Sequence, residues 1–210
     1  MIRYSTSVKW TLGALLGFLV AAGPSAAEGR RYVLDAARSS LTVRTGRAGL
    51  FGFAGHEHLV LATRIRGEVE ADPTSLASSS VSVTVDAASL VVQADGEGDD
   101  VPKVQARMVG PDLLDVGRFP EIAFRSRTVT GTAAGASFDL VVSGDLTLHG
   151  ATKPCIFRVK VELSGDTLTA TGKGVLRQTT FGLVPVSVGG VVKVKDEVAL
   201  DYKFVGIATR

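Results

Sequence analysis

The stretch Phe138–Leu148 carries the clearest hydrophobic pattern in the chain, because apolar and polar residues alternate along it. Side chains on a β-strand point to opposite faces in turn, so this alternation predicts a long strand with one apolar and one polar face. A sheet made of such strands must hide its apolar face by closing on itself or by packing on another sheet. The apolar face consists of Phe138, Leu140, Val142, Leu146 and Leu148.

The same two-residue period recurs elsewhere and predicts eight or more strands in total. Short links rich in turn residues separate several of these segments, for example His149-Gly150-Ala151 and Ser164-Gly165-Asp166. Such short links favour antiparallel neighbours, so the pattern predicts an all-β, antiparallel fold. The further strands are expected near Tyr32–Leu34, Leu41–Thr45, Ile65–Asp72, Val81–Asp86, Ile122–Arg125, Cys155–Leu163, Leu168–Thr171 and Val198–Phe204.

One segment, Gln93–Gly117, breaks the period. Apolar residues recur there at helical spacing, so we expect one short helical excursion at about residues 100–116. An insertion of this length serves either as a lid or plug or as an amphipathic helix that covers an open end of the sheet. The apolar residues with helical spacing are Val101, Val104 and Met108.

Residues 1–27 have the features of a secretory signal peptide. Arg3 and Lys9 form a basic start, Trp10–Ala22 is an uncharged apolar run, and small residues end at Ala27. The run of 13 residues is shorter than the ~20 that span a bilayer, so no membrane span is expected. We predict cleavage after Ala27, a periplasmic or secreted protein, and a single mature domain over residues 28–210.

Composition excludes some classes of protein. Without Arg3 and Lys9 the mature chain has 21 basic and 21 acidic residues, and a neutral chain without basic clusters gives no support for nucleic-acid binding. Cys155 is the sole cysteine, so no intramolecular disulfide can form, and we expect it to be a small buried apolar residue. A homodimer through exposed strands or the Gln93–Gly117 segment stays an open alternative.

Three segments in order resemble the motifs of the YceI-like family. Leu113–Ser126 (LLDVGRFPEIAFRS) is similar to that family's F-D-V-x-x-Y/F-P-x-I-x-F-x-S segment, and Gly144–Pro154 (GDLTLHGATKP) closely resembles its G-D-L-T-I-H-G-V-T-K-P motif. Arg177 to Leu183 resembles its R-x-D-F-G-L signature, with Thr180 at the usual Asp position. The opening segment also resembles the family's start, with Arg38 in place of the usual His. The resemblance extends over Tyr32–Ile207.

This resemblance implies a lipocalin-like antiparallel barrel, exported to the periplasm in Gram-negative bacteria. It also implies an apolar small-molecule ligand, such as an isoprenoid quinone, a polyprenyl chain or a fatty-acid derivative, and no required cofactor. A barrel of about eight strands is wide enough to hold one small ligand or to be filled by its own side chains. Burial of ~16 methylenes gains roughly 13 kcal/mol gross, against ~4–15 kcal/mol for immobilisation. Reversible carriage of such a chain is therefore feasible.

Strand parity and loop position together predict the ligand-binding residues. Alternate residues along each predicted strand share its inner face, and this alternation predicts the lining from the strands. Phe51, Phe53 and Phe181 are predicted instead because they lie in loops. We expect His56, His58 and Arg177 at the polar end of the site. The predicted lining from the strands is Ile122, Phe124, Leu140, Val142, Leu146, Leu148, Phe157 and Val159.

A metal-binding protein or metalloenzyme built on the histidines is the alternative interpretation. In an extended segment His56 and His58 point to the same face, as two ligands of one divalent metal would, and His149 is the third histidine of the chain. The competing interpretation is that the pair forms hydrogen bonds at the barrel mouth. Catalysis has little support because the chain has no G-x-S-x-G elbow. A third alternative is a solidly packed barrel that binds nothing.

Overall fold

The computed structural model of the chain describes residues 29–48, 58–93, 101–185, 187–188 and 192–209. The predicted signal peptide lies outside the described residues, as do Phe51, Phe53 and His56.

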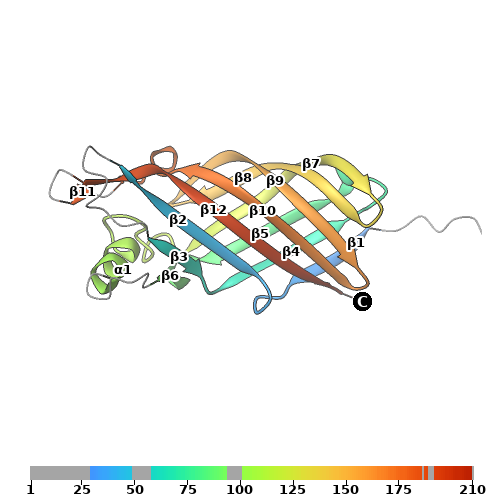
Figure 1. Cartoon of the computed structure of the whole chain (residues 1–210), viewed down its shortest axis with the longest axis horizontal. Coiled ribbons are helices and arrows are strands. Elements are labelled where there is room, and N and C mark those ends of the chain that lie inside the picture. Colours follow the sequence, from blue (N-terminus) through green and yellow to red (C-terminus); the bar gives the residue numbers. More distant parts are fainter. Residues whose placement is uncertain (1–28, 49–57, 94–100, 186, 189–191, 210) are drawn as a thin grey trace, which may run out of the picture.

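Strands dominate the described chain, and they run obliquely along an elongated barrel (Figure 1). They are β1 (Arg30–Leu34), β2 (Ser40–Ala48), β3 (Leu59–Ala62), β4 (Ile65–Ala71), β5 (Ser80–Asp86), β6 (Leu90–Val92), β7 (Glu121–Ala134), β8 (Ser137–Leu148), β9 (Ala151–Ser164), β10 (Thr167–Arg177), β11 (Ser187–Val188) and β12 (Val192–Ala208). The helical elements are α1 (Val101–Val109) and the 3₁₀ turns η1 (Leu76–Ser78), η2 (Ala87–Ser89) and η3 (Gln178–Phe181).

Eight of these strands form a closed antiparallel ring, in the order β1-β4-β5-β7-β8-β9-β10-β12. The ring closes because β1 pairs with β4 on one side and with β12 on the other. Closure removes the free strand edges that an open sheet would present. The predicted all-β barrel of about eight strands is confirmed.

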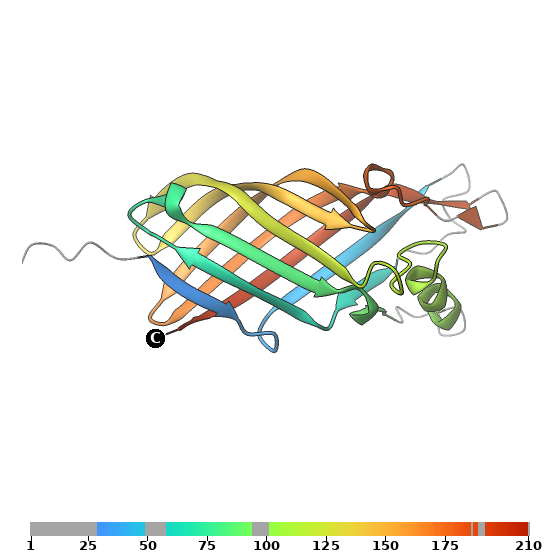
Figure 2. The same ribbon diagram turned by 180° about the vertical axis from the view of Figure 1, so that it is seen from behind.

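The last strand, β12, pairs with β10 along one edge and with two different strands along its other edge. Near its C-terminal end β12 pairs with β1, whereas its earlier part pairs with β2, and the sheet continues from β2 through β3 to β6. Short links join β3 to β4 and β5 to β6, so in each pair the second strand begins close to the end of the first (Figure 2). At this end of the barrel the segment around α1 lies against β6.

The helical excursion is shorter than expected. We predicted helix at about residues 100–116, but α1 ends at Val109 and residues 111–114 form a turn. Gly110 and Pro111 account for the early end, because Pro disfavours a helical residue before it and Gly often terminates a helix. Among the described residues, none of the helices has the length and apolarity needed to cross a bilayer.

The predicted hairpin turns connect neighbouring strands as expected. His149 and Gly150 join β8 to β9 with φ angles of 50° and 72°, and Gly165 has a φ of 57° in the β9–β10 link. Positive φ at both central residues matches the twist of a two-residue hairpin. The short links therefore fix the register of β8, β9 and β10, whose inner faces form much of the barrel wall.

Residues on the two faces of the barrel wall differ in character. Polar and charged side chains alternate outward, and several form ion pairs between adjacent strands, such as Arg127–Asp145 at 2.7 Å and Lys173–Asp201 at 3.6 Å. The buried apolar cluster lies at the α1 end, where Leu114 packs with residues of β3 to β6. Cys155 belongs to the inner face of β9 and is half-buried. Burial, and secondarily the charge of Asp145, raises the pKa of its thiol.

Candidate functional site

The inner face of the barrel is apolar but not tightly packed. Phe157, Val159 and Val161 of β9 all point inward, yet each is only half-buried. Inward side chains of a solid core normally lose nearly all their accessible surface. The inner wall therefore encloses space that the side chains do not fill.

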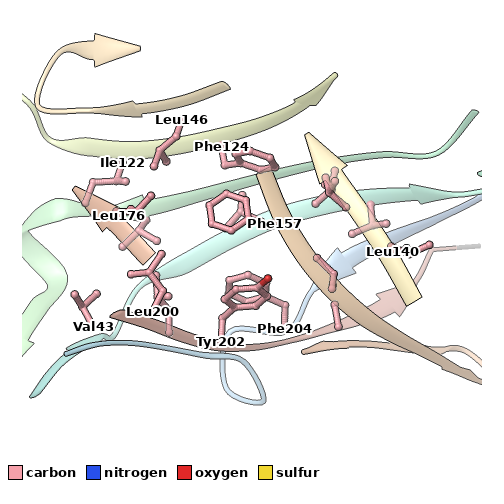
Figure 3. Close-up of a pocket in the computed structure, with 18 of the residues that line it drawn as sticks. Val43, Ile122, Phe124, Leu140, Leu146, Phe157, Leu176, Leu200, Tyr202 and Phe204 are labelled. Carbon is pink, nitrogen blue, oxygen red and sulfur yellow. The ribbon is translucent and has the colours of Figure 1, made fainter. Parts of the chain in front are cut away.

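That space is a cavity of about 310 Å³ lined almost wholly by apolar residues (Figure 3). Its volume is roughly twenty times the ~15 Å³ that admits one water molecule. The lining reaches Leu76 at the η1 end of the barrel and Met108 at the α1 end. On β8 it runs from Phe138 to Leu148, which at ~3.4 Å per residue and a tilt of ~40° extends about 25 Å along the barrel.

Most polar side chains on the lining are already bonded within the protein. The Tyr202 hydroxyl donates to the Arg158 carbonyl at 3.0 Å, and the Gln178 amide donates to the Lys195 carbonyl at 2.9 Å. Burial raises the pKa of Tyr202 to about 12, so its hydroxyl stays protonated at neutral pH. Within the described part of the chain, every buried side-chain nitrogen and oxygen has a hydrogen-bond partner. In the middle of the cavity a ligand would therefore contact apolar side chains.

Charged residues reach the cavity lining at its two ends. Asp72 belongs to the η1 end, where its carboxylate accepts hydrogen bonds from Thr74. These bonds, the side-chain bond first, lower the pKa of Asp72. Arg177 belongs to the α1 end, and its side chain is 67% exposed and pairs with Glu197 at 3.0 Å. Among the described lining residues, a ligand with one polar group would find charged partners only near an end of the cavity.

The predicted strand residues all lie on the cavity wall. They are Ile122 and Phe124 of β7, Leu140, Val142, Leu146 and Leu148 of β8, and Phe157 and Val159 of β9. Their contact with a ligand stays a prediction.

The predicted loop residues are placed differently. Phe181 in η3 is 2% exposed and is not among the residues that line the cavity. His58 comes directly before β3, and its backbone NH donates to the Thr45 hydroxyl at 3.2 Å. Of the two described members of the predicted polar end, His58 and Arg177, it is Arg177 that belongs to the lining.

The metal hypothesis gains no support from the described residues. Among them, no group of three or more His, Cys, Asp or Glu side chains could hold a metal ion. His149 lies in the β8–β9 turn, where its ring packs edge-on against Phe119 with centroids 4.6 Å apart. Because His56 lies outside the described residues, the three-histidine site is still an untested hypothesis.

Sequence reasoning did not select the residues that β10 and β12 contribute to the cavity. The predicted segment Val198–Phe204 covers the inner residues of β12, so its alternation alone would have identified them, whereas Leu176 lies beyond the predicted part of β10, Leu168–Thr171. The missed lining residues on these strands include Leu176, Val198, Leu200, Tyr202 and Phe204.

Comparison with known proteins identifies a family by sequence. The YceI-like domain matches residues 32–205 of the chain. A UPF0312 protein of Vibrio cholerae is 31% identical over 155 residues, which cover 73% of this chain and 74% of that protein. A UPF0312 protein of Shewanella putrefaciens is 29% identical over 178 residues, covering 83% and 85%.

Solved structures share the fold at lower identity. BcnA of Burkholderia cenocepacia superposes with a TM-score of 0.64 at 22% identity, covering 82% of this chain and 98% of that one. A polyisoprenoid binding domain from Saccharophagus degradans, implicated in plant cell wall breakdown, gives a TM-score of 0.62 at 17% identity, covering 85% and 98%. The barrel is therefore similar to solved barrels over nearly their whole length.

Proposed function

The chain belongs to the YceI-like family, and we propose that it is a binding protein that holds the hydrocarbon chain of a lipid or isoprenoid inside its barrel. One observation carries the proposal, namely the apolar cavity of about 310 Å³ along the barrel. An eight-stranded barrel can instead be filled by its own side chains. The cavity, rather than the fold by itself, is thus the argument for binding.

The chemistry of the lining favours a ligand with a long hydrocarbon part. A C–C bond of ~1.5 Å at ~111° advances about 1.25 Å along an extended chain, so 25 Å corresponds to roughly 20 carbons in line. Isoprenoid quinones, polyprenyl chains and fatty-acid derivatives all meet this requirement. The neighbour from Saccharophagus degradans, described as a polyisoprenoid binding domain, is consistent with this ligand class.

The proposed role is to carry or sequester such a chain outside the cytoplasm. Export is supported by the basic start, the apolar run and the small residues of segment 1–27. In an aqueous compartment a hydrocarbon chain is stabilised by binding inside a protein, because its transfer from water to an apolar cavity gains ~0.8 kcal/mol per methylene.

Native mass spectrometry of the protein purified from a bacterial host tests the proposal. We expect the mass of residues 28–210 plus that of a bound lipid, and organic extraction should release the lipid. A bare chain that also fails to take up added stearate would overturn the proposed function. Recovery of the chain only in the cytoplasmic fraction, with residues 1–27 retained, would contradict export alone.

Two substitutions on β8 sharpen this experiment. Leu146 is 6% exposed on the inner face, so Leu146→Arg places an unpaired charge in the apolar interior and should abolish lipid retention or folding. Val141 lies on the outer face of the same strand, so Val141→Arg should keep the lipid and native stability. Equal lipid retention by both variants would contradict the assigned inner face.

A further inference from the structure

Four aromatic rings lie in contact along one side of the cavity. Phe124 of β7 meets Phe157 of β9 edge-to-face with centroids 5.1 Å apart, and Phe157 meets Tyr202 of β12 at 6.2 Å and 90°. Tyr202 in turn stacks on Phe204 at 5.4 Å. We call Phe124, Phe157, Tyr202 and Phe204 the aromatic arc (Figure 3).

The arc lies midway along the cavity. Leu140 belongs to the lining on the η1 side of the arc, whereas Leu176 and Leu200 belong to the lining on the α1 side. A ligand that uses the whole cavity must therefore pass the four rings. A ring that pointed across the lumen would occupy space that such a ligand needs.

Glycines on the intervening strands leave room for the rings against the wall. A Cβ on Gly144 of β8 would lie 2.8 Å from Phe124 Cζ, and one on Gly172 of β10 would lie 2.6 Å from Tyr202 Cζ. A Cβ on Gly174 would lie 3.2 Å from Phe157 Cε1. We call the inner faces of these three glycines the glycine niches. Small barrels commonly alternate large and small inward residues in this way.

A hydrogen bond holds one ring in its niche. The Tyr202 hydroxyl reaches past Gly172 to the Arg158 carbonyl on β9. The ring consequently lies flat along the wall instead of projecting into the lumen. A side chain on Gly174 would push the Phe157 ring away from the wall, and the cavity is the open side, whereas one on Gly144 would first meet the Arg125 carbonyl oxygen.

From this arrangement we infer that the glycine niches keep the two halves of the cavity connected. The protein can therefore bind a hydrocarbon chain that is long enough to extend past the aromatic arc. The inference rests on the proposed function. It identifies the ligand as one with a single extended chain of more than about ten carbons, since half of 25 Å holds about ten. It also names Gly144, Gly172 and Gly174 as the residues that determine chain length.

The test compares stearate with decanoate in Gly174→Val, measured by calorimetric titration. Gly174 is chosen because Phe157 is its nearest contact and no backbone atom lies closer than that ring. In the wild-type protein stearate should bind at least about a hundredfold more tightly, because each extra methylene adds ~0.8 kcal/mol. In Gly174→Val the displaced Phe157 ring should reduce that preference to less than about tenfold, while decanoate affinity changes by less than about threefold.

Two further variants separate a blocked channel from a damaged fold. Gly174→Val combined with Phe157→Ala should regain the preference for stearate, since the displaced ring is gone. Gly117→Val is the matched control, because a Cβ on Gly117 meets nothing within 4 Å, and it should behave as wild type. An unchanged stearate preference in a natively stable Gly174→Val, or no recovery in the double variant, would overturn the inference. Failure of the wild-type protein to bind either acid would instead contradict the proposed function.

Discussion

Tyr202 shows how one polar atom is accommodated in an otherwise apolar wall. Its hydroxyl is bonded to the Arg158 carbonyl, and Gly172 provides the space for the ring. Because burial raises the pKa of Tyr202 to about 12 from an ordinary value of 10, the folded protein retains this proton where the unfolded chain releases it. The contribution of this group to stability is therefore fully present below pH 10 and is lost as the pH rises towards 12.

Tyr202→Phe tests this coupling. The variant loses one hydrogen bond, so we expect a lower free energy of unfolding at neutral pH by about 1 kcal/mol. Between pH 10 and 12 its stability should fall less steeply than that of the wild type, since no phenol remains at that site. Urea unfolding at a series of pH values measures both effects. Parallel pH profiles for the two proteins would contradict the buried, protonated hydroxyl.

At the scale of elements, α1 substitutes for a missing strand. β6 ends the path that leaves the ring through β2 and β3, and the side chain of Gln105 meets its outer edge where another strand would pair. Its carbonyl oxygen accepts from the Val92 NH at 2.8 Å and its amide donates to the Leu90 carbonyl at 2.9 Å. One side chain thus satisfies both backbone groups that a neighbouring strand would satisfy.

Gln105→Ala should loosen this end of the barrel. Two hydrogen bonds at ~1 kcal/mol each are lost, and two partly buried backbone groups are left without them. We expect a loss of about 2 kcal/mol in stability and faster amide exchange at Val92. Arg107→Ala on the exposed side of the same helix should change stability by less than about 0.5 kcal/mol. Unchanged protection of Val92 would show that Gln105 does not hold β6.

Some elements were predicted better than others, for local reasons. The alternation in β8 and β9 is clear because apolar residues occupy nearly every inward position. Only Ile122–Arg125 of β7 was expected, since a register shift between Ser126 and Thr128 and a run of small polar residues hide the rest. The strands β3 and β6 have four and three residues, too few to show a period.

At the scale of the whole molecule, the cavity divides the barrel into a packed end and a hollow middle. The cluster around Leu114 fills the α1 end, whereas the inward residues of β9 keep accessible surface. A hydrocarbon ligand would complete the packing of that middle region. Ligand binding should therefore contribute to stability.

Removal of the lipid tests this contribution. A ligand at a hundred times its Kd stabilises the folded state by ~2.7 kcal/mol, which for a domain of this size raises the Tm by roughly 5–10 °C. We expect delipidated protein to melt lower and added stearate to restore the Tm in wild type and in Val141→Arg. A Tm that is insensitive to both treatments would indicate a middle region that needs no ligand.

The sequence by itself determined the regularly alternating strands and their inner faces, because the two-residue period is a local property that each such segment displays on its own. It therefore placed Phe124, Leu146 and Phe157 on the inner wall correctly. Only the tertiary structure decided that β12 closes the ring with β1, that Gln105 meets β6, and that glycines lie behind the rings of the arc. Whether an inner face encloses a cavity depends on how side chains from distant strands share one volume, and no single segment contains that information.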